Sequence, residues 1–289
     1  MSQYHQEPAG RLKWQVVGRT PDASLRGNVQ SYTGYVEYAA APMRRLEVPF
    51  AGIPLILSLG PSLLVDGVRH RSFVAGLGDA ATWTEYAGEQ RGIQVNLSPL
   101  GARRLLGLPM AELARRVVAL EDVLGADAEQ LVERLHEAPG WEARFALLDT
   151  VLLQRSDRAA PIAPQVEHAW ARLQASGGAA MIAMLAEEVG WSRRHLAARF
   201  GADVGLPPKT VARILRFQRV TQRLRRAGGS GLAEVAYACG YADQAHLNRD
   251  FRAFAGTTPT DFAARLLSGG AGVVGDELPN VQEAIANAA

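Results

Sequence analysis

The sequence predicts an α+β chain in which a β-barrel or jelly roll with following helices precedes an all-α carboxyl-terminal half. Three observations support this class. Short apolar runs separated by turn residues occupy positions 31–97, apolar spacing of the 3.6-residue type follows Leu97, and one pattern of residues occurs twice between Leu185 and Arg265. With 289 residues, 48% apolar and 21% charged, the chain is long enough for about two domains, each with its own core.

The amino-terminal half is predicted to contain antiparallel strands. Residues 1–28 are interpreted as a polar arm with one short strand at 14–17. The strand candidates after it are 32–38, 46–50, 54–59, 63–65, 68–74, 81–86 and 93–97. Asp66 and Gly67 indicate a two-residue hairpin, because both turn positions need positive φ. A small barrel is the natural closure for this many short strands.

Helices are predicted after Leu97. The candidates are 99–106, 110–124, 128–137 and 141–154, followed by 165–174, a long helix at 209–226 and a short tail helix at 281–287. The prolines and small residues of "SDRAAPIAP" interrupt the helical pattern. We therefore expect a β-rich sensor or dimerisation domain at 1–157, a linker at 158–164, a helical domain at 165–268 and a flexible tail at 269–289.

The repeated pattern predicts two helix-turn-helix units. The first copy is Ala186, Gly190, Leu196, Phe200, Gly205 and Pro208, and the second is Ala236, Gly240, Leu247, Phe251, Gly256 and Pro259. The first two positions recur after 50 residues and the last four after 51. The small residue allows close helix packing, the first glycine ends the helix, and two apolar positions four apart bury one face of the next helix. The long helix at 209–226 is expected to join the two units.

The opposite face of the second helix in each unit is predicted to bind DNA. Ser192 and Asp243 suit the N-caps of these helices. Side chains that read base edges or phosphates occupy the free faces. They are Arg193, Arg194, Ala197 and Ala198 in the first copy, and Gln244, Ala245, His246, Asn248 and Arg249 in the second. Together with Ser192 and with Lys209, which is expected to contact a phosphate, they form the predicted DNA-binding set.

These motifs resemble a known family. The order Leu-Ala, Gly-x-Ser, "RRHLAARF", "GLPPK" and "CGYADQAHLNRDFRAFAGTTP", over residues 162–267, resembles the AraC/XylS transcription regulators. The resemblance implies two helix-turn-helix units joined by a long helix, double-stranded DNA as partner, a homodimer, and RNA polymerase as a partner if the protein is an activator. Ala197 and Ala198 stand where the family often has longer polar side chains. Direct readout by the first unit would then rest on Arg194.

The amino-terminal half resembles the sensor half of these regulators in architecture only, which implies a cupin-like barrel that binds a small-molecule effector and a helical segment that dimerises. The charged residues are distributed unevenly between the two halves of the chain. Residues 161–268 contain 14 basic and 8 acidic residues, whereas residues 1–160 contain 17 and 18. The excess of positive charge in the half with the repeat favours a polyanionic partner there.

We find neither a signal-peptide core nor an 18-residue apolar run, so the sequence predicts a cytoplasmic protein without a membrane partner.

Enzymatic functions find little support in the sequence. His70 is the one histidine within 31–97, so the His-x-His pair of a metal-dependent cupin is missing, and no cofactor or metal is predicted. The sequence has no Gly-x-Ser-x-Gly, P-loop or dinucleotide motif. The single cysteine, Cys239, is interpreted as a buried helix residue, with a redox sensor as the alternative. A cupin enzyme with an accessory DNA-binding module stays open as a minor alternative.

The leading hypothesis is a sequence-specific regulator controlled by an effector, and the alternative is an effector-independent regulator whose first domain is a dimerisation module. Aromatic and polar strand residues are the candidates for the effector pocket. They are Tyr35, Trp83, Glu85, Tyr86 and Asn96. Because side chains alternate along a strand, Trp83 and Glu85 share one face and Tyr86 takes the other. We predict that Trp83 and Glu85 face the pocket, since an inward carboxylate needs a partner that a cationic or hydroxylated ligand supplies.

Overall fold

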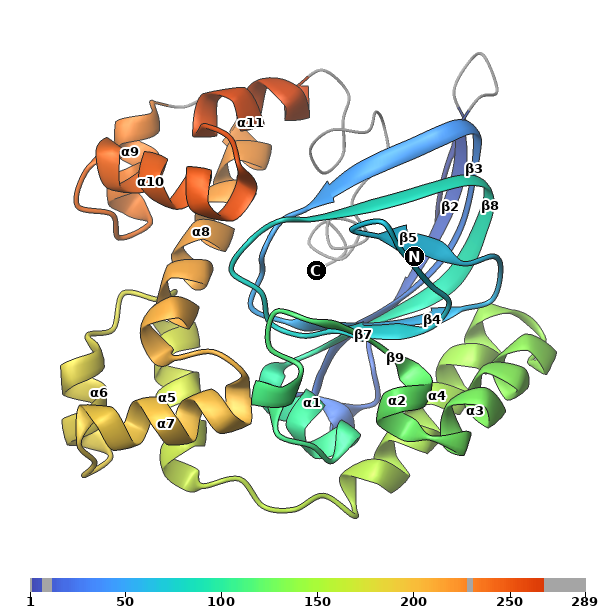
Figure 1. Ribbon diagram of the computed structural model, residues 1–289, viewed down its shortest axis with the longest axis horizontal. Helices are drawn as coiled ribbons and strands as arrows, with labels where there is room; N and C mark the ends of the chain where they lie inside the picture. Colours follow the sequence, from blue (N-terminus) through green and yellow to red (C-terminus); the bar gives the residue numbers. More distant parts are fainter. Residues whose placement is uncertain (1, 7–11, 228–230, 268–289) are drawn as a thin grey trace.

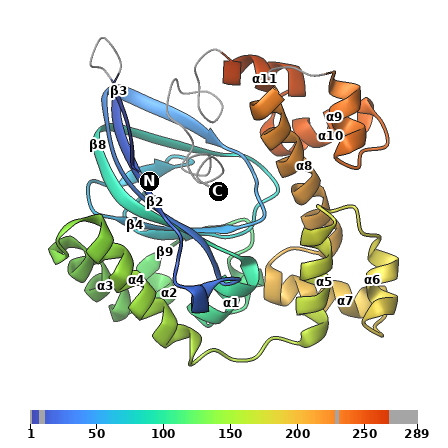
Figure 2. The same cartoon turned by 180° about the vertical axis from the view of Figure 1, so that it is seen from behind.

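The computed structural model describes residues 2–6, 12–227 and 231–267. An antiparallel sheet fills the amino-terminal half, helices α1 to α4 lie along one side of it, and α5 to α11 form a column beside it (Figures 1 and 2). The α+β class and the order of strands, helices and an all-helical half are confirmed. The predicted tail helix at 281–287 lies outside the described residues.

Nine strands form the sheet, and β3 and β8 are its long central pair. The strands are β1 (Ser2–Gln6), β2 (Leu12–Arg19), β3 (Val29–Glu47), β4 (Ile53–Ser58), β5 (Leu63–Val65), β6 (Val68–His70), β7 (Phe73–Ala75), β8 (Thr82–Leu97) and β9 (Val117–Ala119). They pair in the order β1-β2-β3-β8-β4-β7-β9, while β5 pairs with β6 and β8. Within the described residues β1 and β9 do not pair with each other, so the expected barrel is an open one.

Some predicted strand and helix boundaries need correction. The candidate at 32–38 and the first two residues of the one at 46–50 fall on the continuous β3, while 48–50 are loop, and the candidates at 81–86 and 93–97 fall on β8. A register shift between Ala39 and Met43, where β3 contains Pro42, places two extra residues on β3, and the two strands stay paired on both sides of it. Part of the helix expected at 110–124 is strand β9, whose β-branched Val117 and Val118 pair with β7. The Asp66–Gly67 hairpin is confirmed, with φ of 47° and 80°.

The helices follow the predicted spacing closely outside that segment. They are α1 (Pro99–Leu106), α2 (Leu120–Leu124), α3 (Ala126–Glu137), α4 (Gly140–Ser156), α5 (Pro164–Ala175), α6 (Ile182–Glu188), α7 (Arg193–Val204), α8 (Pro208–Ala227), α9 (Leu232–Ala238), α10 (Gln244–Ala255) and α11 (Pro259–Leu267). Short 3₁₀ turns occur at 23–25 and 110–112. Figures 1 and 2 show α8 running from the pair α6 and α7 to the group α9 to α11.

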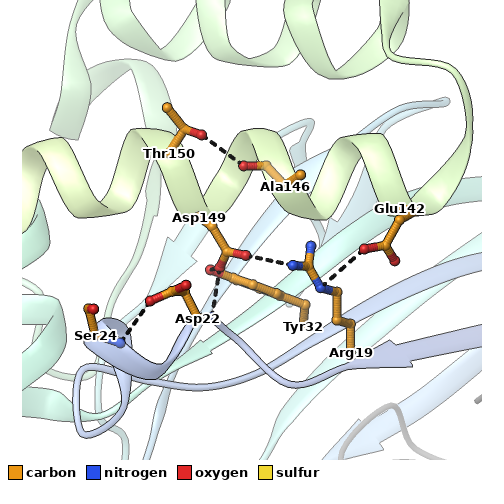
Figure 3. Close-up of polar contacts among 8 residues, drawn as sticks. All are labelled: Arg19, Asp22, Ser24, Tyr32, Glu142, Ala146, Asp149 and Thr150. Atoms are coloured by element: carbon orange, nitrogen blue, oxygen red, sulfur yellow. Dashed lines mark hydrogen bonds and ion pairs between the residues drawn. The ribbon is translucent and has the colours of Figure 1, made fainter.

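A buried carboxylate fastens α4 to the sheet (Figure 3). Asp149 accepts hydrogen bonds from the Arg19 guanidinium at 2.9 Å, from the Tyr32 hydroxyl at 2.9 Å and from the Asp22 backbone N–H at 3.1 Å. Burial and then the hydrogen bond to Asp149 raise the pKa of Tyr32, so its hydroxyl stays a donor. The Tyr32 ring also stacks on Phe145 of α4 at 5.8 Å. Three donors satisfy Asp149, which makes it a structural group rather than a reactive one.

The amino-terminal half and the helical column share one continuous apolar core. Polar contacts supplement it at three places. Arg103 of α1 forms an ion pair with Asp203 of α7 at 3.3 Å, and Arg104 pairs with Glu167 of α5. The Ala51 backbone N–H, in the loop between β3 and β4, donates to the Gln218 side chain of α8 at 3.1 Å. The loop beside the sheet is therefore in direct contact with the long helix.

Candidate nucleic-acid interface and ligand cavity

The first helix-turn-helix unit is made of α6 and α7. Leu185 and Ala186 are buried on α6, and Leu196 and Phe200 are fully buried on α7, as their spacing predicts. Gly190 takes φ 69°, a left-handed conformation that ends α6 at little cost for glycine. The Ser192 hydroxyl caps α7 by accepting a hydrogen bond from the His195 backbone N–H at 3.2 Å.

The second unit, made of α9 and α10, reproduces this arrangement. Val235 and Ala236 are buried on α9, and Leu247 and Phe251 are buried on α10. Gly240 has φ 80°, and the Asp243 carboxylate caps α10 through the His246 backbone N–H at 2.6 Å. The sequence repeat is thus a repeat of backbone geometry, cap and core.

One further pair of equivalent contacts was missed by the sequence interpretation. The ring of Trp191 meets His195 edge-on at 4.5 Å, and the ring of Tyr241 meets His246 in the same way at 5.0 Å. The aromatic positions recur after 50 residues and the histidines after 51, the offsets of the rest of the repeat. The sequence contains a signal for this contact, because each aromatic residue directly follows the glycine of its turn. Each histidine packs against its turn and helps to orient the helix that follows.

The structure places most of the predicted DNA-binding residues on the surface. Ser192, Arg193, Arg194, Ala198, Lys209, Gln244, Ala245 and Arg249 are exposed, and Ala197, His246 and Asn248 are half-buried. Arg193, Arg194 and Arg249 form no ion pair with any residue that the structure describes. Their guanidinium groups are available to an external acceptor, and their role at DNA stays a prediction.

The arginines of α8, by contrast, hold the protein together. Arg213 pairs with the buried Asp250 of α10 at 2.7 Å, Arg216 donates to the Gly178 carbonyl at 2.6 Å, and Arg219 donates to the Ala238 carbonyl at 3.1 Å. These bonds connect α8 to the turn after α5 and to α9 and α10 of the second unit. A helix of 20 residues is about 30 Å long, close to the ~34 Å of one DNA turn, so α8 has the length to carry two units to successive major grooves.

A cavity of about 170 Å³ lies on the inner face of the sheet. Its apolar walls include Ile56, Val65 and Phe73, and Tyr35 and Tyr86 add aromatic surface. The loop between β3 and β4 also contributes to the lining, through Val48, Pro49, Phe50 and Gly52. The apolar walls and a few polar groups are typical of a small-molecule site.

Three polar side chains converge in this cavity. The buried Glu37 carboxylate pairs with Arg45 at 2.7 Å, and Arg45 also donates to the Tyr86 hydroxyl at 2.7 Å. Burial alone would lower the pKa of Arg45, but Glu37, Tyr86 and Glu47 outweigh it and raise that pKa, so the guanidinium stays charged. Burial, followed by the charge of Glu37, raises the pKa of both Tyr35 and Tyr86. Both phenols are therefore neutral donors at physiological pH.

Trp83 and Glu85 lie on the other face of β8. Thr82, Thr84 and Tyr86 line the cavity, so the strand alternation is as expected, but its inner face is not the predicted one. The Arg44 guanidinium stands over the Trp83 ring at 4.1 Å, and Arg44 is the cross-strand neighbour of Glu85. Asn96, also outside the cavity, donates to the Ser31 hydroxyl at 3.1 Å and accepts from Gln94 at 2.8 Å. Of the five candidates, Tyr35 and Tyr86 remain in the lining.

Other reactive groups have ordinary surroundings. Cys239 is fully buried, and burial raises the pKa of its thiol, which disfavours the reactive thiolate. The His70 ring packs against Phe73 at 5.5 Å. In the described part of the chain no cluster of histidine, cysteine and acidic residues has the arrangement of a metal site, and no helix there is long and apolar enough to cross a membrane.

Comparison with known proteins identifies the helical half. Residues 185–265 match the model of a helix-turn-helix domain, and this domain is of the AraC type, as the sequence resemblance predicted. No curated protein matches the chain.

Several solved structures are similar to the chain. ToxT from Vibrio cholerae O395 is 10% identical with a TM-score of 0.45, over 90% of this chain and 99% of that one. An AraC-type regulator from Chromobacterium violaceum is 26% identical with a TM-score of 0.33, over 37% and 96%. The carboxyl-terminal domain of AraT, a response regulator from Geobacillus stearothermophilus, is 19% identical with a TM-score of 0.34, over 36% and 88%. All three TM-scores are below 0.5, so we base the functional assignment on the domain match and on the site itself.

Proposed function

We propose that this chain, whose residues 185–265 form an AraC-type helix-turn-helix domain, is a sequence-specific transcription regulator under the control of a small molecule. The observation that carries the DNA-binding role is the pair of equivalent helices, α7 and α10, each capped in the same way and each presenting exposed arginine. In this role Arg194 and Arg249 read base edges, while Lys209 contacts a phosphate.

Footprinting on selected operator fragments tests the DNA arrangement. Two units joined by a helix about 30 Å long should protect two short elements about 10–10.5 base pairs apart on one face of the duplex. A single protected element, or two on opposite faces, would show that the two units do not bind successive grooves. Fragments with five base pairs inserted between the elements serve as the matched control, since half a turn moves the second element out of reach.

Control by an effector is supported by the cavity and by its position. The loop at 48–52 lines the cavity through Phe50 and Gly52, and Ala51 between them bonds to Gln218 of α8. A ligand that moves this loop would move a contact of the helix joining both DNA-binding units. A thermal-shift screen is the test, because a ligand at 100 times its Kd adds about 2.7 kcal/mol of stability. A screen without any stabilising compound would favour the effector-independent alternative.

The proposed function also covers the oligomeric state, the protein partners and the absence of catalysis. The protein acts without catalysis, as a homodimer, and contacts RNA polymerase if it activates transcription. Elemental analysis of the purified protein tests the competing cupin-enzyme hypothesis, which requires about one metal ion per chain. Light scattering of the free and DNA-bound protein tests the dimer.

A further inference from the structure

We propose that the cavity binds an uncharged molecule about the size of one aromatic ring, carrying one hydrogen-bond acceptor, and that it discriminates against carboxylates. The inference rests on the proposed effector control and adds the chemical class of the effector and the residues that select it. Three features of the cavity support it: its size, the sign of its charges, and one donor without an acceptor.

Size limits the ligand first. The cavity measures about 170 Å³. An apolar cavity of roughly 150 Å³ in another protein stays dry and binds benzene. A single ring with a short substituent therefore fits this space, and the aliphatic walls with Tyr35 and Tyr86 offer it apolar and aromatic contacts.

The charges select against anions. Among the described residues that line the cavity, the charged ones are Glu37, Arg45 and Glu47, which sum to a formal charge of −1. Arg45 is already paired with Glu37 at 2.7 Å. A ligand carboxylate would have to share that guanidinium with Glu37 in a setting where like charges are poorly screened. A neutral ligand leaves the existing ion pair intact and avoids this repulsion.

The Tyr35 hydroxyl supplies the specificity for an acceptor. Tyr35 lines the cavity, burial raises the pKa of its hydroxyl so that it stays a donor, and this hydroxyl has no hydrogen-bond partner among the described residues. A buried donor without an acceptor is costly, so a group that accepts from it is favoured. A ketone, ether or alcohol oxygen meets this need without adding charge. The ligand class is thus a ring with a neutral oxygen substituent.

Three probes of one size test the charge preference in the full-length protein. Acetophenone, benzoate and benzylammonium share a ring and differ in the charge of the substituent, and calorimetry or ligand-observed NMR gives their Kd values without DNA. We expect acetophenone to bind at least about tenfold more tightly than benzoate, because the carboxylates repel benzoate. We also expect it to bind more tightly than benzylammonium, because an ammonium group has no acceptor and is costly to remove from water. Benzoate or benzylammonium as the tightest probe, or no binding of acetophenone, overturns the proposed class.

A variant pair assigns the preference to the cavity. Glu37→Gln removes the carboxylate that holds Arg45, so benzoate should gain at least about tenfold relative to acetophenone. Glu85→Gln removes the same charge from the outer face of neighbouring β8 and should leave the wild-type ratio unchanged. Equal benzoate-to-acetophenone ratios in both variants would contradict selection by Glu37. If the Glu37→Gln protein does not fold, the wild-type probe series decides.

Footprinting of the same preparations separates the two proposals. A benzoate preference with an intact operator footprint overturns the ligand class alone, whereas a lost footprint contradicts the proposed DNA-binding function.

Discussion

At the scale of single residues, Arg194 of α7 and Arg249 of α10 are exposed and form no ion pair with any described residue, whereas Arg213 of α8 pairs with Asp250. We expect Arg194→Ala or Arg249→Ala to cost roughly 1–3 kcal/mol of operator binding and to relax the preference at particular base pairs, if these side chains read guanine edges. Binding to a library of operator variants measures both effects. A uniform loss over all sequences would instead assign the arginine to a phosphate.

Lys209 provides the contrasting residue. It is exposed near the start of α8, where its ammonium group can approach the backbone of the duplex. Lys209→Ala should therefore weaken binding to all sequences alike and lower the slope of log K against log salt by about 1. The matched comparison is Arg194→Ala at the same salt concentrations, and a base-selective effect of Lys209→Ala would refute the phosphate contact.

At the scale of elements, the N-caps decide whether the recognition helices are in place before DNA arrives. Asp243→Ala removes the side-chain acceptor for the His246 backbone N–H and should destabilise the second unit by about 1 kcal/mol. Hydrogen exchange at the first turn of α10 should accelerate, and the second element of the footprint should weaken before the first. Glu234→Ala, which removes an exposed charge from the same unit without a cap hydrogen bond, is the control. Equal exchange in the two variants would argue against the cap.

The two helix-turn-helix units were predictable because each signal is local. A glycine with positive φ, a capping side chain and two apolar residues four apart act within about fifteen residues of sequence, and the structure places all of them as predicted. The inner face of β8 was not predictable in this way. Alternation separates Trp83 from Tyr86, but both faces carry apolar and polar residues, and the covering of one face by distant helices decides which face encloses the cavity. The bulge after Ala39 and the strand at 117–119 likewise depend on long-range pairing.

At the scale of the whole molecule, the sheet and the DNA-binding column are in contact through the loop between β3 and β4. Phe50 and Gly52 line the cavity, whereas Ala51 faces α8 and bonds to Gln218. Ala51 and Gln218 also line a second hollow between the two halves. Neighbouring residues of one short loop thus contact the ligand site on one side and the helix that spaces the two units on the other. Under the proposed effector control, a ligand that shifts the position of this segment would also shift its contact with α8.

Removing the Gln218 contact should uncouple the two sites without disabling either. In the wild-type protein we expect saturating acetophenone to change operator affinity by a factor in the usual allosteric range of about 5–150. In Gln218→Ala this factor should fall toward 1, because the Ala51 N–H loses its acceptor on α8, while ligand affinity and ligand-free operator affinity stay close to wild type. Gln222→Ala, one turn along α8 and without a hydrogen bond to the loop among the described residues, should retain the coupling. Equal coupling factors in the two variants would mean that the ligand signal reaches the DNA-binding units by another contact, and the Arg103–Asp203 pair between α1 and α7 would then be the next to replace.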